Sequence, residues 1–355
     1  MNNIPEEFNI IKTGHGYTIK GWDFNTTEIR EALKGDRMLN PAFELASNSC
    51  PWDCGFCFTE DPNNPEGLKK ALANEMTLDE RLHLIDQARQ LGARTINIVG
   101  AGEPTIDPNF WQIVEHTSAK GITPIIYTEG ALRLTNPRFA KRLYDLGATV
   151  VLKVNSLENE DYQNHVVNSG ERKMKPLKMD YFHERNKALE VLLDAGFAKH
   201  DPTRLAFDTI ICQENYDEIP RIHQYARDHN IFVLFVNYLP SGRSSNLKQN
   251  AISQKEQFAI FDKLANIDKE RYGINHRAIF PYAGGTPCSI RGLGLYVKIQ
   301  GAVYDCPGES EALGNIRQES LQDVWKKAMH IREHFDGGCL PRELFWKRYI
   351  STQTT

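Results

Sequence analysis

Three cysteines close together near residue 50 carry the clearest chemical signal in the chain. They are Cys50, Cys54 and Cys57, in the run Cys-Pro-Trp-Asp-Cys-Gly-Phe-Cys. This spacing places three thiolates around one face of a cubane iron–sulfur cluster and leaves the fourth iron without a protein ligand. A cluster used only for electron transfer normally has four cysteine ligands. An open iron can bind a small molecule, as the open position of a catalytic metal site does. The three cysteines therefore predict a cluster that takes part in a reaction.

Two other roles for these cysteines fit the sequence less well. A local zinc site needs a fourth ligand nearby, and no Cys or His occurs between Cys57 and His83. A disulfide framework is disfavoured because seven cysteines in 355 residues are sparse and odd in number.

A second motif of small residues ends the next predicted strand, in the run Gly100-Ala101-Gly102-Glu103-Pro104. Small residues let backbone carbonyls approach a bound ammonium group. The carboxylate of Glu103 supplies a charge partner in a partly dry site. A strand-to-helix turn that happens to contain two glycines is the simpler alternative.

The two motifs together resemble the signature of the radical S-adenosylmethionine (SAM) enzymes. Phe56 before the third cysteine matches an aromatic residue of that signature, and residues 100–104 resemble its Gly-Gly-Glu-Pro motif, with Ala101 replacing one glycine. The resemblance implies a [4Fe–4S] cluster whose open iron binds the amino and carboxylate groups of SAM. It implies reductive cleavage of SAM to a 5′-deoxyadenosyl radical. The implied cofactor-binding residues are Phe56, Gly100, Gly102, Glu103 and Pro104.

The ends of two later strands carry weaker signals of the same kind. Thr128 and Glu129 end the third predicted strand, where relatives often show Thr-Asn-Gly near the methionine part of SAM. Lys153 and Asn155 end the fourth, where relatives often place polar residues against the ribose, although Lys153 departs from the serine usual in some subfamilies. The resemblance implies SAM contacts for all four residues, and solvated strand ends are the alternative.

The C-terminal part of the chain holds three further cysteines, Cys288, Cys306 and Cys339. Residues 295–299 and 302–304 predict a β-hairpin that brings Cys306 towards Cys288. This arrangement resembles the shortened auxiliary-cluster module called twitch, which is related to the longer SPASM module. The resemblance implies a second [4Fe–4S] cluster with three cysteine ligands. The alternative is three buried thiols that only pack.

The remaining cysteine and the sixth strand supply candidate substrate contacts. Cys212 ends the fifth predicted strand, where it either packs inside the barrel or donates a hydrogen atom to a substrate radical, as in radical SAM epimerases. Asn237, Tyr238 and Arg243 lie at and after the sixth strand, where relatives often carry a similar Pro-x-Gly-Arg segment. These three are the candidate substrate-binding residues.

Composition restricts the partners and the compartment. Charged residues make up 25% and hydrophobic residues 41% of the chain, as is ordinary for a soluble globular protein. The formal charge of −4 gives no basic surplus for a general nucleic-acid or membrane surface. No secretory signal or apolar stretch of membrane-spanning length stands out. Because cluster-binding thiols must stay reduced, we expect a cytoplasmic protein.

Short apolar strands alternate with amphipathic helices between residues 43 and 240, which predicts βα units on a parallel sheet. The predicted strands are 43–49, 95–100, 123–128, 149–155, 204–212 and 231–239. Thr77 and Glu80 predict a capping box at one helix start, and Gly92, Gly147 and Gly196 predict helix ends. Six repeats are two short of a closed barrel, and they match the partial (β/α)6 barrel that the resemblance implies.

The expected organisation has four parts. They are an N-terminal extension (1–42), the barrel core (43–243), a linking helical segment (244–284) and a twitch-like module of β-hairpin and helix (285–355). The cysteine loop then follows the first strand, at the carboxyl edge of the sheet where βα proteins collect their chemistry.

The expected function is that of a radical SAM oxidoreductase acting on a small polar biosynthetic substrate. Hydrogen abstraction is followed by net oxidation or bond formation, with the auxiliary cluster as electron acceptor. A reductant such as flavodoxin or ferredoxin supplies the electron. The alternatives are an epimerase that uses Cys212, a peptide-modifying maturase, and a non-catalytic iron–sulfur or zinc scaffold.

Overall fold

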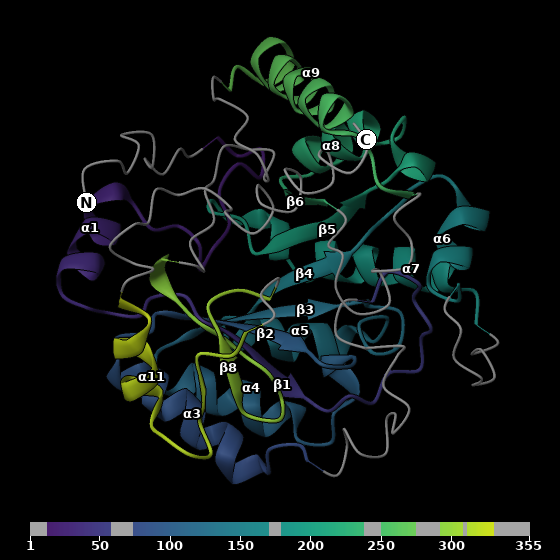
Figure 1. Ribbon diagram of the computed structural model, residues 1–355. Helices are drawn as coiled ribbons and strands as arrows, with labels where there is room; N and C mark the ends of the chain where they lie inside the picture. The colour runs from purple at the N-terminus through teal and green to yellow at the C-terminus, as the bar shows by residue number, and fades with distance from the viewer. Residues whose placement is uncertain are drawn as a thin grey trace, which may run out of the picture.

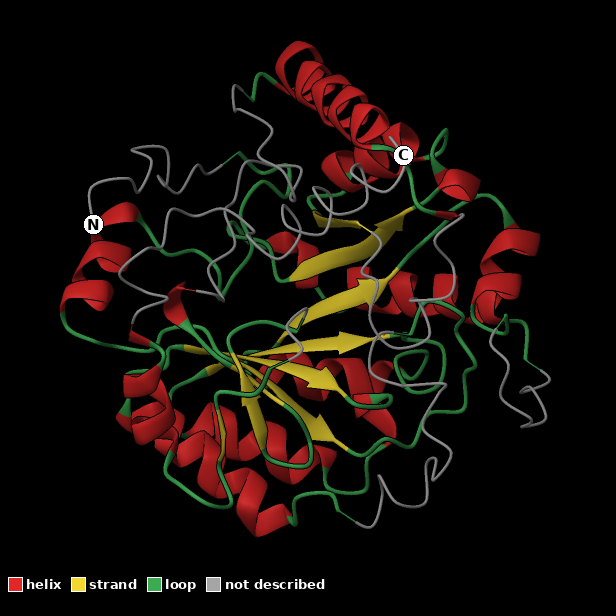
Figure 2. Ribbon diagram, viewed as in Figure 1, coloured by secondary structure: helices red, strands yellow, loops and turns green. Residues whose placement is uncertain are grey.

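The computed structural model describes residues 13–57, 74–169, 179–237, 250–274, 292–307 and 311–329. Its main feature is a nine-stranded sheet in the order β6-β5-β4-β3-β2-β1-β7-β8-β9, open at both ends (Figures 1 and 2). Six neighbouring strands are parallel and follow chain order. They are β1 (Ala42–Ala46), β2 (Thr95–Gly100), β3 (Thr123–Thr128), β4 (Thr149–Lys153), β5 (Leu205–Ile211) and β6 (Phe232–Asn237). The predicted partial βα barrel is confirmed, and each strand lies within or within one residue of its predicted range.

Helices connect these strands and cover the outer face of the sheet (Figure 2). Apolar residues from α3, α4, α5, α7 and α8 share one core with those of the sheet. The main described helices are α1 (Thr26–Lys34), α3 (Leu78–Gln90), α4 (Phe110–Ala119), α5 (Pro137–Asp145), α6 (Glu160–Val166), α7 (Tyr181–Asp194), α8 (Ile219–Asp228), α9 (Gln254–Tyr272) and α11 (Leu321–Lys327). None of the described helices combines the length and the apolar character that a membrane span requires.

Local signals set the ends of several helices. At the start of α3 the Thr77 hydroxyl accepts a hydrogen bond from Glu80 N at 3.3 Å, and Thr77 N donates to the Glu80 carboxylate at 2.7 Å. This is the predicted capping box. Gly92, Gly147 and Gly196 follow α3, α5 and α7 with φ of 98°, 75° and 93°, a backbone conformation that favours glycine.

The inner face of the sheet carries a second apolar cluster, formed by Ile19, Ile125, Val151, Ala206, Phe232 and Leu234. Ile19 comes from the N-terminal extension, which crosses the amino ends of the strands. Lys20 N donates to Thr203 O at 2.8 Å, the Thr95 hydroxyl donates to Gly21 O at 2.7 Å, and Trp22 Nε1 donates to Asn97 Oδ1 at 2.8 Å. This segment therefore closes the amino end of the barrel. The functional site is then expected at the carboxyl edge of the sheet.

The predicted C-terminal hairpin is present as β7 (Tyr296–Val297) and β8 (Ala302–Tyr304), which are antiparallel, with β9 (Gly314–Asn315) beside β8. The hairpin also continues the barrel sheet, because β7 pairs in parallel with β1. A buried carboxylate on β1 strengthens this contact. Glu44 accepts hydrogen bonds from the Tyr296 hydroxyl and from Ile299 N, and burial raises the pKa of its carboxyl.

The helix α9, in the predicted linking segment, is held to α8 by buried charges. Asp268 accepts two hydrogen bonds from Arg227, at 2.9 and 2.8 Å, and lies 2.6 Å from Nε2 of His223. The remaining Arg227 nitrogen donates to the carbonyls of His15 and Gly16. The ion pair therefore ties α9, α8 and the N-terminal extension together.

Candidate functional site

The cysteine loop follows β1 and lies at the carboxyl edge of the sheet. Cys50, Cys54 and Cys57 are half-buried thiols. Asp53 N donates to Val167 O at 2.9 Å, and Gly55 N donates to the Ser169 hydroxyl at 3.1 Å. The loop is therefore held by the segment that follows α6, more than 100 residues further along the chain.

The tip of β2 packs directly against this loop. A β-carbon on Gly102 would lie 2.2 Å from Ser49 O and 2.6 Å from Ser47 O, too close for any side chain. Glu103 N donates to Ser49 O at 3.2 Å. Pro104 is buried and begins a short 3-10 helix, η1 (Pro104–Ile106). The glycine at position 102 is thus required by a close backbone approach.

The Glu103 carboxylate joins the tips of β2 and β3. One oxygen accepts from the hydroxyls of Thr105 and Thr128, both at 2.6 Å, and the other accepts from Glu129 N at 3.0 Å. Burial raises the pKa of the Glu103 carboxyl, although these hydrogen bonds favour its charged form. The sequence motif and the Thr128-Glu129 pair therefore form one connected group.

Glu129 is a second buried carboxylate beside the first. It accepts hydrogen bonds from Ala131 N at 2.9 Å and Leu132 N at 3.1 Å. Burial raises its pKa well above the usual value, and the charge of Glu103 adds to the shift. Burial also raises the pKa of the Cys50 thiol to about 12, with Glu103, Cys57 and Glu129 as further causes. Several acidic groups thus share one dry region.

The thiols and carboxylates of this region are chemically suited to bind a positively charged cofactor. Thiolates are the usual ligands of iron–sulfur clusters. Negative groups crowded away from water are stabilised when iron and an organic cation replace their protons. The side-chain Nδ2 of Asn155 is also buried and has no hydrogen-bond partner among the described residues. Its other groups join β4 to the neighbouring segments, with Oδ1 accepting from Ile210 N at 3.1 Å and Asn155 N donating to Gln163 at 2.9 Å.

A charged pair faces the inside of the barrel near the cysteine loop. Lys153 Nζ lies 3.0 Å from Asp208 Oδ2, and the two side chains are 15% and 21% exposed. The same ammonium group lies 4.9 Å from the ring centre of Phe56, a cation–π distance. The sequence analysis did not name Asp208 as a site residue. It could have been found from the sequence, because it is a lone carboxylate in the apolar strand β5.

Cys212 follows β5 and contacts a residue that the sequence analysis did not single out. Its Sγ lies 3.0 Å from the hydroxyl of Tyr162 on α6, a short helix in a stretch that carried no helix prediction.

Asn237 ends β6 and pairs with Ile211. Cys306 follows β8 and is half-buried. Four predicted residues lie outside the described ranges, namely Tyr238, Arg243, Cys288 and Cys339.

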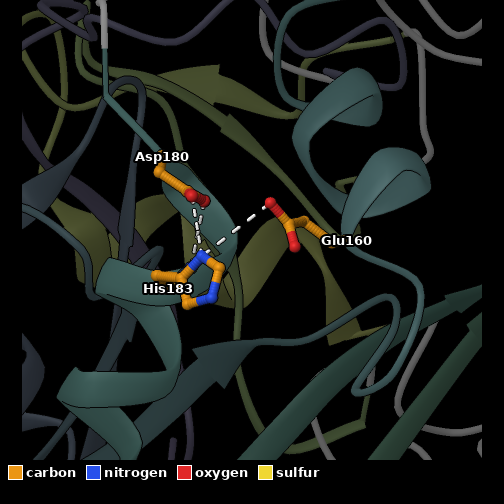
Figure 3. Close-up of side chains that lie close together, drawn as sticks. All are labelled: Glu160, Asp180 and His183. Atoms are coloured by element: carbon orange, nitrogen blue, oxygen red, sulfur yellow. Dashed lines mark hydrogen bonds and ion pairs between the residues drawn. The ribbon is translucent and has the colours of Figure 1, made fainter.

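A separate cluster of polar side chains lies on the surface. Figure 3 shows His183 between Asp180 and Glu160, with Nδ1 at 2.6 Å and 3.9 Å from their carboxylates. All three residues are exposed. Asp180 caps α7 by accepting a hydrogen bond from His183 N, and its hydrogen bond raises the pKa of the His183 imidazole. Helix capping accounts for this group.

The fold and the site together define an open βα-barrel protein with a cysteine-rich cofactor site at its carboxyl edge. The sequence profile of the radical SAM superfamily matches residues 45–226, just over half of the chain. The chain therefore belongs to the radical SAM superfamily, which implies a [4Fe–4S] cluster and SAM.

Similar proteins differ in what they do. The chain is 25% identical to the mycofactocin maturase MftC of Mycolicibacterium smegmatis, over 76% of this chain and 72% of the relative. It is 23% identical to the AdoMet-dependent heme synthase of Methanosarcina barkeri, over 85% of both chains. A crystal structure of Streptococcus suis SuiB with its precursor peptide SuiA has a TM-score of 0.62 at 14% identity, covering 90% of this chain and 76% of that one. The structural likeness supports the fold alone.

Proposed function

We propose that the chain reductively cleaves SAM at a [4Fe–4S] cluster held by Cys50, Cys54 and Cys57, and that it oxidises a small polar biosynthetic substrate or forms a bond in it. When bound, the cluster and SAM supply a 5′-deoxyadenosyl radical that abstracts a hydrogen atom from an unactivated C–H bond. The protein positions that bond and excludes water.

The observation that carries the proposal is the group formed by the cysteine loop, Gly102, Glu103 and the tip of β3. The loop packs on Gly102, and the Glu103 carboxylate binds the two strand tips together at 2.6–3.0 Å. The proposed cofactor contacts are Phe56, Gly100, Gly102, Glu103, Pro104, Thr128, Glu129, Lys153 and Asn155.

A second [4Fe–4S] cluster at Cys288, Cys306 and Cys339 is the proposed electron acceptor. The hairpin that carries Cys306 supports it, because β7 lies next to the strand that leads into the cysteine loop. The residues that follow β6 (Asn237, Tyr238 and Arg243) are the proposed substrate contacts. The same proposal includes a cytoplasmic location and flavodoxin or ferredoxin as reductant. It also includes the four-part division of the chain, with a twitch-like C-terminal module.

Two other reactions have specific support. A peptide substrate is consistent with the maturase MftC and with SuiB bound to a precursor peptide. Epimerisation is consistent with the hydrogen bond between Cys212 and Tyr162. Both keep the same cofactor site and differ in what happens to the substrate radical.

The deciding experiment is anaerobic reconstitution with iron and sulfide, followed by dithionite and SAM. We expect 5′-deoxyadenosine in the wild type and none when the three cysteines Cys50, Cys54 and Cys57 are replaced by Ala. A non-catalytic scaffold would bind iron without forming 5′-deoxyadenosine in either protein.

A further inference from the structure

Lys153 and Asp208 form an ion pair on the inner face of the barrel, and Asp208 has no part in the proposed cofactor site. Val151 on β4 and Ala206 on β5 belong to the apolar cluster of that face. Lys153 and Asp208 follow two residues later on the same strands, so they point to the same side, one layer nearer the carboxyl edge. The strand register places them opposite each other, with Nζ of the lysine 3.0 Å from Oδ2 of the aspartate.

The apolar layer below the pair is closed, while the pair itself is partly exposed. The residues of the inner apolar cluster are at most 6% exposed. The side chains of Lys153 and Asp208 are 15% and 21% exposed, and Ile210, the next inner residue of β5, is also partly exposed. Among the described residues, the pair therefore lies directly above an apolar floor, on the side of the carboxyl edge.

Stability alone does not account for this ion pair. The attraction between two ions that leave water roughly offsets the cost of removing their hydration. A few charged groups on an otherwise apolar inner surface are typical of sites that orient a ligand. The Lys153 ammonium group also lies 4.9 Å from the ring centre of Phe56 in the cysteine loop. The pair is thus close to the proposed site of SAM cleavage.

The charges of the pair restrict the ligand that it can bind. A ligand with a single charge would engage one member of the pair and leave the other without a full partner in a partly dry place, which is costly. A ligand with one ammonium and one carboxylate group keeps all four charges paired. An α-amino acid carries both groups on one carbon, close enough to meet two side chains that lie 3.0 Å apart.

We infer that Lys153 and Asp208 bind the head group of a free α-amino acid, which is the substrate of the barrel. Asp208 accepts hydrogen bonds from the substrate ammonium group. Lys153 donates one of its three N–H groups to the substrate carboxylate. The inference rests on the proposed function and narrows its small polar substrate to one class. SAM has the same head group, but the proposed function places that group on the open iron.

The first test measures binding without cleavage of SAM. The reconstituted chain is saturated with SAM, without reductant, and titrated in a calorimeter with each common L-amino acid. We expect at least one to bind. Its 2-hydroxy acid analogue and its amine analogue without the carboxylate should each bind about tenfold or more weakly, because each lacks one charge-assisted contact. No binding by any amino acid, binding only in the absence of SAM, or equal binding of either analogue overturns the inference.

Variants assign each contact to its side chain. Asp208→Asn should lose the preference for the amino acid over the hydroxy acid and keep the preference over the amine. Lys153→Met should show the reverse. Asp217→Asn and Lys187→Met change exposed side chains, and both should keep the two preferences. A merely structural pair would weaken all three ligands equally, and that outcome overturns the inference.

The second test adds dithionite and the bound amino acid in fully deuterated form. A C–D bond of the amino acid breaks, a C–D bond forms on 5′-deoxyadenosine, and the unpaired electron remains on the amino acid. We expect one deuterium in 5′-deoxyadenosine. Unlabelled 5′-deoxyadenosine overturns the role of the amino acid as substrate. Absence of 5′-deoxyadenosine overturns the proposed function, and the titrations tell this failure apart because they do not depend on SAM cleavage.

Discussion

The Glu103 carboxylate accepts hydrogen bonds from residues on two strand tips, so this one side chain connects β2 with β3. Two opposing effects act on the charge of this carboxylate. Burial disfavours its charge, while the donors around it favour that charge. A cation bound nearby, such as the ammonium group of SAM, would shift this balance towards the carboxylate.

Replacing Glu103 by Gln tests this side chain. An amide has one acceptor oxygen in place of two, so its NH2 group would face a donor. We expect the free energy of unfolding to fall by about 1–3 kcal/mol, the cost of an unsatisfied buried donor. SAM binding is expected to weaken by about tenfold or more, since charge-assisted hydrogen bonds contribute about 1.5–3 kcal/mol. Urea denaturation and calorimetric titration with SAM measure the two effects, with the exposed Glu115→Gln as control. An unchanged SAM affinity would contradict a role for Glu103 in binding.

His183 gives a pH-dependent prediction on the surface. The hydrogen bond and charge of Asp180 raise the pKa of its imidazole. The pair therefore stabilises the fold fully below the ordinary histidine pKa of 6.5, and this contribution is lost as pH rises through the raised value. We expect Asp180→Asn to keep the helix cap and to lower the His183 pKa towards 6.5, as followed by NMR. A pKa that stays raised in Asp180→Asn would show that Asp180 is not the cause.

At the scale of elements, the pairing of β7 with β1 links the C-terminal hairpin to the strand that leads into the cysteine loop. Glu44 is the polar part of this contact, and it is buried with both carboxylate oxygens hydrogen-bonded. The raised pKa of its carboxyl means that the folded state binds a proton more tightly than the unfolded chain. Glu44 therefore contributes stability below pH 4.5 that is lost as pH rises through the raised pKa.

Two substitutions at Glu44 separate charge from shape. Gln can accept from Ile299 N and donate to the Tyr296 oxygen, so we expect Glu44→Gln to keep the hairpin docked and to make stability less dependent on pH above 4.5. Ala would leave both partners unsatisfied and open a cavity, and we expect it to cost about 2–4 kcal/mol. Urea denaturation at several pH values measures both. Equal stability of the Ala variant and the wild type would show that this contact does not hold the hairpin.

At the scale of the whole molecule, the N-terminal segment closes one end of the barrel while the cysteine loop, Glu103 and Cys212 lie at the other. The hairpin extends the same sheet past β1 (Figure 1). One continuous sheet thus carries both the first cysteine group and Cys306. Two clusters on one sheet would suit the proposed transfer of an electron from the substrate radical.

Iron content tests this arrangement. With two [4Fe–4S] clusters we expect about eight irons per reconstituted chain. Replacing Cys50, Cys54 and Cys57 by Ala should leave about four and abolish 5′-deoxyadenosine. Replacing Cys306 by Ala should lower the iron content while SAM cleavage persists. A wild-type content of about four irons per chain would contradict the second cluster. The epimerase alternative would then be the better account of the reaction.

The amino-acid sequence determined the features that depend on neighbouring residues. The capping box of Thr77 and Glu80, the glycines after α3, α5 and α7, the βα alternation and the hairpin around Gly301 were all predictable. Each depends on the geometry of a few consecutive residues. The spacing of Cys50, Cys54 and Cys57 is also a local feature of the sequence. Together with residues 100–104 it was enough to indicate the family.

Only the tertiary structure decided which distant groups meet. The contacts of Glu103 with Thr128, of Lys153 with Asp208 and Phe56, and of Tyr162 with Cys212 join segments that are far apart in the chain. So does the parallel pairing of β7 with β1. These contacts depend on strand register and on the packing of side chains in three dimensions, because a shift of one residue turns a side chain to the other face of the sheet. A single sequence contains the residues for such contacts without the register that brings them together.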